Sequence, residues 1–185
     1  TIKMDGSGRQ GKNALKATAK VTARRMQIKQ LFPAIEGLQA SVGHVNGDAA
    51  LSATGNSIAT LLAASNGEVH TLISQGTVSK LLLEKMGLNL GNIILTSLFG
   101  DKQVRINCMA TDFAVDRGIM YSRTFVVDTE EAIIHVDGIV SLVDETFNLT
   151  INPKTKGLRV ISLRAPLYVR GPFKQPKVSV DKGVL

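Results

Sequence analysis

Two overlapping glycine patterns near the start of the chain have the spacing of nucleotide-binding motifs. Gly6, Gly11 and Lys12 match the G-x4-G-K spacing of a phosphate-binding P-loop, and the same stretch contains G-x-G-x-x-G. Both motifs need a buried strand before the loop and a helix after it, because the helix N-terminus holds the phosphate. Here only "TIKM" precedes the loop, the residues after it alternate as a strand, and Asn13 occupies the Ser/Thr position. We therefore interpret residues 5–13 as a glycine-rich hairpin turn.

The single cysteine is the next residue that could do chemistry. One cysteine excludes an internal disulfide and a cysteine-cluster metal site. Cys108 could act as a nucleophile, but it alternates in phase with Val104 and Ile106 on the apolar side of a predicted strand. A buried free cysteine behaves as a small hydrophobic residue, and no catalytic partner is evident from the sequence. We therefore predict that Cys108 belongs to the core.

The histidines and the clustered acids also have structural interpretations. The three histidines, which lie too far apart in sequence for a zinc motif, are His44, His70 and His135. His135 shares its predicted strand face with Asp137, which favours a solvated face over a catalytic pair. Asp128, Glu130 and Glu131 could be paired carboxylates or a calcium loop, but they cluster at a strand end, where a polar turn is expected. We predict a non-enzymatic protein with no catalytic residue, metal or cofactor.

All of the excess positive charge lies near the start of the chain. The net charge is +7; residues 1–30 hold 8 Lys and Arg against one acid, whereas residues 31–185 hold 14 of each sign. The basic strand predicted within 12–29 could be a solvated edge, a contact for anionic lipid headgroups or a nucleic-acid contact. Residues 1–31 contain no aromatic side chain that could stack on bases, so nucleic acid is the least favoured partner.

Strands and helices are both predicted in the first hundred residues. Apolar and polar residues alternate over 14–23, and the phase changes at Arg24–Arg25, which predicts a bulge or a bend. Further strands are expected over 46–54 and 68–74. Three helical segments are Ile58–Ala64 capped by Asn56 or Ser57, a segment that begins at the cap Thr77 and ends at Gly87, and Asn92–Phe99. They predict a short helical insertion at about 57–99 that plugs or covers one end of the sheet.

From Gln103 onward the chain is predicted to be almost entirely strand. Strands recur every 14 to 16 residues with short links, the pattern of an antiparallel meander. Turns are predicted at 116–118 and at 152–157, and the last strand is "PKVSV". Asp137–Gly138 is compatible with a two-residue hairpin, but apolar residues stay in phase across it, so one long strand fits as well. The predicted fold is mainly β, a long curled antiparallel sheet.

One face of this predicted sheet is apolar. The in-phase residues that form it are Val104, Ile106, Ile134, Val136, Val140, Leu142, Phe147, Leu149, Ile161, Leu163, Leu167 and Val169. Such a face could remain open to an apolar ligand, whose methylenes it would have to cover continuously. Alternatively, the predicted helices cover the same face and make an ordinary closed core. The sequence leaves both interpretations open.

Several short motifs in residues 45–180 resemble the C-terminal region of AsmA-family envelope proteins. These motifs are the helix start Gly55-Asn56-Ser57, the strand "INCMATDF", the strand end Asp128-Thr129, the strand start at Glu145, and "RAPLYVRGPF" with a proline after it. Residues 1–44 match only as generic strand. The resemblance implies an inner-membrane protein of a Gram-negative bacterium, with one N-terminal transmembrane helix and a long periplasmic β-sheet body. The sheet is thought to form an apolar groove that carries phospholipids towards the outer membrane.

The ends and the hydropathy of the chain fit a piece of such a protein. No run of 18 uncharged apolar residues exists, no signal peptide is recognisable, and the chain begins with Thr1. We expect residues 1–185 to be a single β-rich domain, a periplasmic fragment whose membrane tether lies elsewhere. Phospholipid and other envelope proteins are the partners that the resemblance implies, with a role in outer-membrane biogenesis. The alternative is a structural or protein-interaction β-module that carries no lipid.

Overall fold

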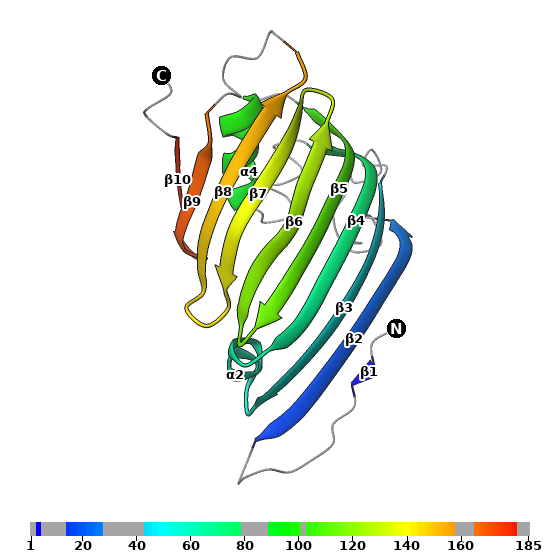
Figure 1. The fold of residues 1–185 in the computed structure, drawn as a ribbon, viewed down its shortest axis with the longest axis vertical. Coiled ribbons are helices and arrows are strands. Elements are labelled where there is room, and N and C mark those ends of the chain that lie inside the picture. The colour runs from blue at the N-terminus through cyan, green and yellow to red at the C-terminus, as the bar shows by residue number, and fades with distance from the viewer. Residues whose placement is uncertain are drawn as a thin grey trace.

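Ten strands form one antiparallel sheet in which each strand pairs with its neighbours in the sequence (Figure 1). The structure, a computed structural model, describes residues 3–4, 14–27, 43–78, 89–100, 103–157 and 165–180. The strands are β1 (Lys3–Met4), β2 (Leu15–Gln27), β3 (His44–Gly55), β4 (Asn66–Val78), β5 (Val104–Asp116), β6 (Ile119–Thr129), β7 (Ala132–Ser141), β8 (Thr146–Thr155), β9 (Leu167–Pro172) and β10 (Lys177–Val180). The predicted meander is confirmed, and it extends through the N-terminal strands as well.

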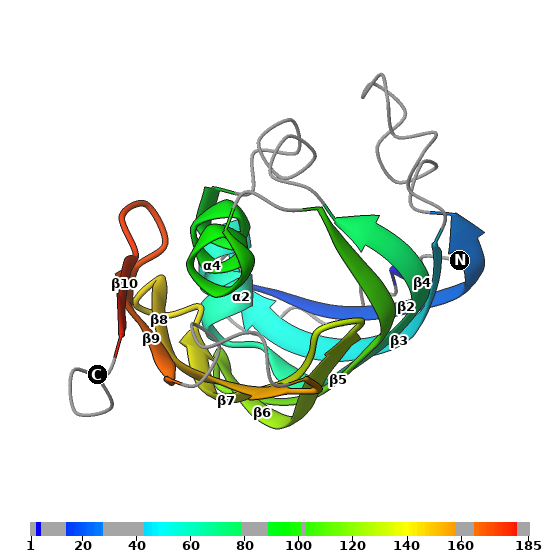
Figure 2. The same ribbon diagram turned by 90° about the horizontal axis from the view of Figure 1, so that it is seen from above.

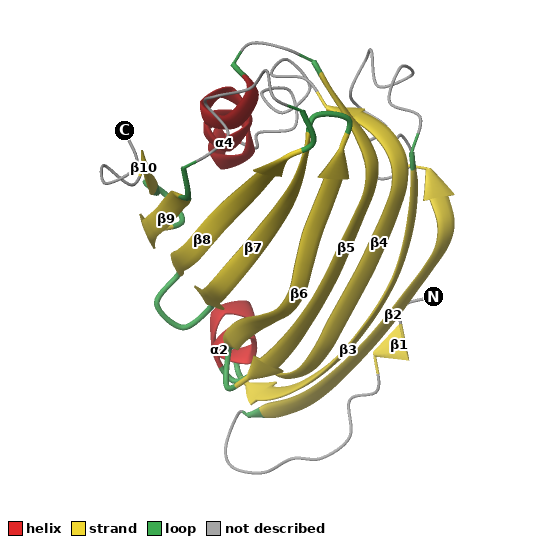
Figure 3. Cartoon of the chain, turned by 45° about the horizontal axis from the view of Figure 1, so that its top comes forward, coloured by secondary structure: helices red, strands yellow, loops and turns green. Residues whose placement is uncertain are grey.

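The sheet curls, and its two long edges do not meet. Figure 2, which looks along the strands, shows the sheet as a trough with α4 (Asn89–Phe99) lying inside it. The strand order runs from β1 to β10 without closure between these two strands. Figure 3 shows α4 near the upper ends of β7 and β8, whereas α2 (Ile58–Ala63) lies at the lower end of the sheet. The predicted curled, mainly β fold is therefore confirmed.

A bulge in β2 explains the change of phase that the sequence shows. The pairing of β2 with β3 shifts between Ala23 and Met26, and Arg25 has a φ of 47°. The backbone N–H of Arg25 donates to Oδ1 of Asn46 (2.8 Å), so the extra residue keeps its hydrogen bond. The predicted bulge at Arg24–Arg25 is confirmed, and apolar side chains stay on one face of β2 on both sides of it.

Two glycines have positive φ, one in a turn between strands and one within a strand. Arg117 and Gly118 form the predicted turn between β5 and β6, with φ of 44° and 73°. Gly138 lies within β7, has a φ of 132°, and faces Leu149 across the ladder. A Cβ at Gly138 would lie 2.1 Å from the carbonyl oxygen of Asn148. Asp137–Gly138 is thus part of one long strand, not a hairpin.

One predicted turn is misplaced. The predicted turn at 152–157 begins too early, because β8 continues through Pro153, which lies opposite Ile134, and ends at Thr155. Pro153 lies beyond the last described β8–β9 pair, Ile151–Leu167, so its missing N–H removes no described hydrogen bond of that ladder. The predicted helical insertion at about 57–99 contains the two described helices α2 and α4, and the 13-residue strand β4 between them includes the predicted strand 68–74.

The helix ends agree better with the sequence. Ser57 caps α2, accepting from the backbone N–H of Thr60 (3.2 Å), as predicted. Helix α4 begins three residues earlier than predicted, at Asn89, and ends before Gly100, whose φ is 69°. Thr77 belongs to β4, so the predicted second helix does not begin there; the rest of that helix, like the glycine-rich turn at 5–13, lies outside the described residues.

The core lies between α4 and the C-terminal half of the sheet. Helix α4 buries Leu95, Leu98 and Phe99 at 8%, 2% and 7% exposure. Their spacing, with Ile94, places one apolar stripe of the helix against the sheet. The buried partners from β5 and from β7 to β9 are Val104, Ala132, Ile134, Val136, Leu149, Ile151, Leu167 and Val169. Within the described residues, no buried side-chain nitrogen or oxygen lacks a hydrogen-bond partner.

Candidate functional site

The concave face of the sheet is apolar from β2 to β9. The pairing registers give one row across seven strands that consists of Met26, Val45, Ile73, Met109, Val127, Ile134 and Pro153. A second row runs through Ala19, Leu51, Gly67, Val115, Met120, Val140, Phe147 and Gly171. No ionisable side chain interrupts either row. Between these rows the same face carries only the small polar side chains Thr71, Thr111 and Ser122. The face is therefore predominantly apolar, and eight strands contribute to it.

Helix α4 covers only one half of this concave face. Its apolar stripe packs on the strands from β5 to β9, which contribute all the buried apolar side chains of the sheet in this core. On β2 the concave side chains remain accessible: Leu15 is 67% exposed and Val21 is 39% exposed. The concave residues of β3 are partly exposed along the whole strand. One apolar sheet surface is thus divided into a covered half, β5–β9, and a half, β2–β4, that no described element covers and that we call the open half.

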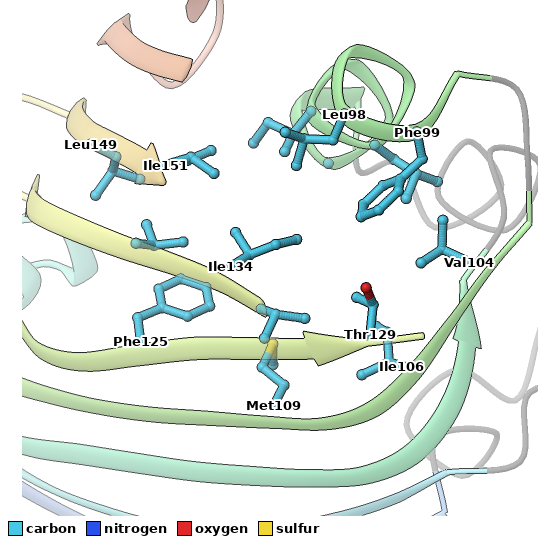
Figure 4. A pocket seen from close by; sticks show the side chains of 15 residues that line it. Leu98, Phe99, Val104, Ile106, Met109, Phe125, Thr129, Ile134, Leu149 and Ile151 are labelled. Carbon is cyan, nitrogen blue, oxygen red and sulfur yellow. The ribbon is translucent and has the colours of Figure 1, made fainter. Parts of the chain in front are cut away.

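A cavity of about 280 Å³ separates α4 from the sheet beneath it (Figure 4). Its roof consists of Gly91, Ile94, Leu95, Leu98 and Phe99 from α4. Its floor consists of Val104, Ile106, Met109, Phe125, Val127, Thr129, Ile134, Val136, Leu149 and Ile151. The single polar side chain of this lining is Thr129, whose hydroxyl donates to the carbonyl of Ala132 (2.8 Å). The cavity can therefore accept hydrocarbon but offers nothing to a charged ligand.

The convex face has the opposite character. The register places Thr22, Asp48, His70, Asp112 and Thr124 in one row across five strands. Asp48 accepts from Arg24 (2.9 Å), and Arg123 donates both to Asp112 (2.7 Å) and to Glu68 (2.9 Å). His70 lies between the last two carboxylates, 3.1 Å from Glu68 and 3.2 Å from Asp112. The sheet thus separates an ion-paired outer face from an apolar inner face.

These ion pairs shift the ionisation of the convex groups. The hydrogen bond from Arg123 lowers the pKa of Glu68, and the hydrogen bond from Arg24 lowers the pKa of Asp48. The hydrogen bond to Asp112 raises the pKa of Arg123. The hydrogen bond from Lys156 lowers the pKa of Asp128 in the same way. All these groups are paired and at least partly exposed to solvent, which is the pattern of a stabilising surface network and not of an acid–base site.

Comparison with known proteins identifies the family. The model of the AsmA family matches residues 1–125. The AsmA family protein YhjG of Escherichia coli (strain K12) is 45% identical over 174 residues, which is 94% of this chain. The chain belongs to the AsmA family. The AsmA match includes residues 1–44, so it extends further towards the N-terminus than the motifs at 45–180 indicate. The chain spans 25% of the length of the E. coli relative, and no solved structure matches it significantly.

The residues predicted to form the apolar face of this AsmA-family chain fall into four groups. Lining the cavity are Val104, Ile106, Ile134, Val136 and Leu149. Leu167 and Val169 are buried behind the cavity at 2% and 0% exposure, and Val140 and Phe147 pack against the core with partial exposure. Leu142 is not on a strand but in the turn after β7, where its N–H donates to the carbonyl of Gly118 (2.8 Å). Ile161 and Leu163 lie outside the described residues.

Sequence periodicity missed several cavity residues because bulges change its phase. The β5–β6 register shifts between Ile106 and Cys108, so Met109, not Cys108, continues the inner face. Cys108 lies opposite Asp128 and is half-buried, which corrects its prediction as a core residue. A second shift, between Asp112 and Phe113, hides the inward position of Phe125 in the same way. The alternation of apolar and polar residues indicates an apolar side on β2. Only the pairing registers show that this side continues through β3 and β4 into the apolar side of β5.

The described residues contain no arrangement typical of a metal or catalytic site. Glu130 and Glu131 lie in the predicted turn between β6 and β7, but Asp128 belongs to β6, and Arg105 pairs with Glu130 (2.9 Å). His135 lies opposite Asn152, and Asp137 accepts from the side chain of that residue (3.4 Å). Within the described part of the chain, no three potential metal ligands form a group. None of its helices is long and apolar enough to cross a membrane.

Proposed function

We propose that this chain is a non-enzymatic module of an AsmA-family envelope protein that carries the acyl chains of phospholipids on its concave face. The observation that supports the proposal is the predominantly apolar concave surface from β2 to β9, half of which no described element covers. We further propose a periplasmic location, with the membrane tether outside these residues, and a role in phospholipid traffic between the two membranes.

The dimensions and energetics of the concave face suit an acyl chain. Burial of hydrocarbon stabilises by about 0.8 kcal/mol per methylene, so a carrier must cover the chain without interruption. A 13-residue strand such as β2 is about 43 Å long. Two acyl chains end to end span the roughly 30 Å hydrocarbon core of a bilayer, so one chain needs about half that length. An acyl chain therefore fits along β2 and β3, whose concave side chains are all apolar, without reaching a polar side chain.

The separation of the two faces gives the lipid one place to bind. The convex face presents paired charges that water solvates well, whereas the concave face has no hydrogen-bonding side chain in its two long rows. Exposed apolar side chains such as Leu15 and Val21 gain free energy when hydrocarbon covers them. The headgroup remains free to face water or another envelope protein at the rim of the trough.

Two substitutions on adjacent residues of β3 test this proposal. Leu51 lies on the open half of the concave face, and its neighbour Ser52 is exposed on the convex face. We expect phospholipid to co-purify with the chain prepared without detergent, Leu51→Asp to lose most of it, and Ser52→Asp to keep it. A carboxylate in an acyl path must be desolvated, which reduces binding at least tenfold. Native mass spectrometry and solvent extraction measure the bound lipid.

The opposite result would support a different function. A parent protein free of lipid under these conditions, or equal lipid in both folded variants, contradicts carriage by the open half of the concave face. The chain would then be a structural or protein-interaction β-module, whose sheet edges pair with other strands. Circular dichroism of both variants establishes that any lost lipid is not a consequence of unfolding.

A further inference from the structure

The cavity beneath α4 is closed on one side and partly open on the other. Towards β9, Leu167 and Val169 fill the space behind it at 2% and 0% exposure. Towards β4, its lining includes Ile106 and Met109, both only half-buried. Met109 lies opposite Ile73 of β4, which belongs to the open half of the concave face. Among the described residues the cavity is therefore a blind extension of the open half, with its mouth at the β4–β5 side.

The lining restricts what can enter this pocket. No charged side chain contributes to it, and its one hydroxyl is already engaged. Thr129 Oγ1 donates to the carbonyl of Ala132 (2.8 Å) and accepts from the backbone N–H groups of Ala132 (2.9 Å) and Glu131 (3.3 Å). A buried water needs two to four polar partners, and a lipid headgroup needs more. Only hydrocarbon can occupy the pocket without leaving polar groups unpaired.

The volume of the pocket is large enough for a part of a lipid but too small for a whole phospholipid. Packed interiors contain few voids larger than a water molecule, and an apolar cavity of about 150 Å³ already binds benzene. The volume of about 280 Å³ is too large for a packing irregularity. It is also below the range of about 300–1,000 Å³ that holds drug-sized ligands, and a phospholipid is larger than these. The end of one acyl chain is the fragment that fits.

We propose that this pocket receives the methyl end of an acyl chain whose remainder lies on the open half, β2–β4. The inference rests on the proposed function and adds an orientation to it: the chain enters methyl end first, and the headgroup stays on the β2–β4 side. Helix α4 then covers the chain end through Leu98 and Phe99, and Leu149 and Ile151 of β8 close the pocket on the side away from its mouth.

Photoreactive phospholipids test the orientation on the unmodified chain. One phosphatidylethanolamine carries a diazirine at the methyl end of its palmitoyl chain, and a second carries it beside the carboxyl group. We expect the methyl-end probe to label peptides that contain Leu95, Phe99 or Ile134, and the carboxyl-end probe to label β2–β4. Mass spectrometry of the digested adducts locates both labels.

A matched pair of substitutions on β7 fills the pocket or leaves it unchanged. Ile134 lines the cavity, whereas the adjacent Ile133 points to the convex face, opposite Asp128. We expect Ile134→Trp to reduce methyl-end labelling in the pocket about tenfold, the effect of about two methylenes losing their burial. Ile133→Trp should leave it unchanged. If Ile134→Trp does not fold, the positions of the two labels on the unmodified chain decide the question.

Each other outcome overturns a distinct statement. Labels from both probes on β2–β4 with none in the pocket overturn the pocket assignment but leave lipid carriage intact. Labelling of the pocket by the carboxyl-end probe overturns the orientation. Absence of any label on the concave face, with either probe, overturns the proposed function together with this inference.

Discussion

Single residues with unusual backbone conformations keep the inner face of the sheet apolar. Arg25 and Gln75 have positive φ, and at both positions the side-chain alternation is reset while the strands continue to pair. The sequence indicates the first reset directly, because two arginines interrupt a regular pattern. It gives no such signal at 106–108, where every residue is compatible with either face. Local composition therefore predicted one bulge and missed the one that turns Cys108 outward and Met109 inward.

The paired carboxylates on the convex face make the stability of the fold depend on pH. The pKa values of Asp48, Glu68 and Asp128 are lowered below their ordinary values of 3.8, 4.5 and 3.8. A carboxylate with a lowered pKa stabilises the folded state above its ordinary pKa, and this contribution is lost as the pH falls through the folded-state value. We expect an unchanged melting temperature from neutral pH down to about pH 5, and a decline below pH 4.5.

Removing the cation that two of the convex carboxylates share tests the cause of this decline. Arg123→Gln should lower the melting temperature at neutral pH and make its decline below pH 4.5 less steep, because Glu68 loses its main partner. Added salt should weaken the parent's network and bring the two proteins closer. Thermal unfolding followed by circular dichroism gives the values. Parallel pH profiles of the parent and Arg123→Gln would show that the acid sensitivity has another origin.

Among the elements, the position of α4 determines which part of the apolar face is a closed core and which part is accessible. Its apolar residues predict that it packs on something, and the strand alternation predicts a sheet with one apolar face. Neither pattern says where along the sheet the helix lies, because that depends on the register of nine strand pairs and on contacts far apart in sequence. The sequence therefore left groove and closed core as alternatives, and the structure combines them: α4 covers β5–β9 and leaves β2–β4 open.

Two substitutions on opposite sides of α4 test its packing. Leu98 is 2% exposed and lines the cavity, whereas Ile93 is 44% exposed. We expect Leu98→Ala to reduce the free energy of unfolding by about 2–5 kcal/mol, the cost of removing a buried leucine side chain. Ile93→Ala should change it by about 0.5 kcal/mol or less, as surface substitutions do. Urea unfolding measures both, and equal losses would contradict the described orientation of the helix.

At the scale of the whole molecule, the trough is the property that the sequence predicts least directly. The meander, the mainly β class and the apolar phase of most strands follow from alternation and turn residues. The curl, the division into two halves and the blind pocket arise from the registers, the bulges and the position of α4 (Figure 2). The two apolar rows depend on the whole sheet, because each strand contributes only one residue to a row and the rows cross seven and eight strands.

Lipid carriage on the concave face is tested most directly by a photoreactive residue placed at successive positions of β3 in cells. p-Benzoylphenylalanine replaces in turn the concave residues Ala49, Leu51 and Ala53 and the convex residues Ala50, Ser52 and Thr54. Mass spectrometry then quantifies the phospholipid adducts. We expect adducts at the three concave positions and few at the three convex ones, an alternation with the period of the strand. Equal yields on both faces, or no adduct at any concave position, would contradict lipid carriage by this sheet.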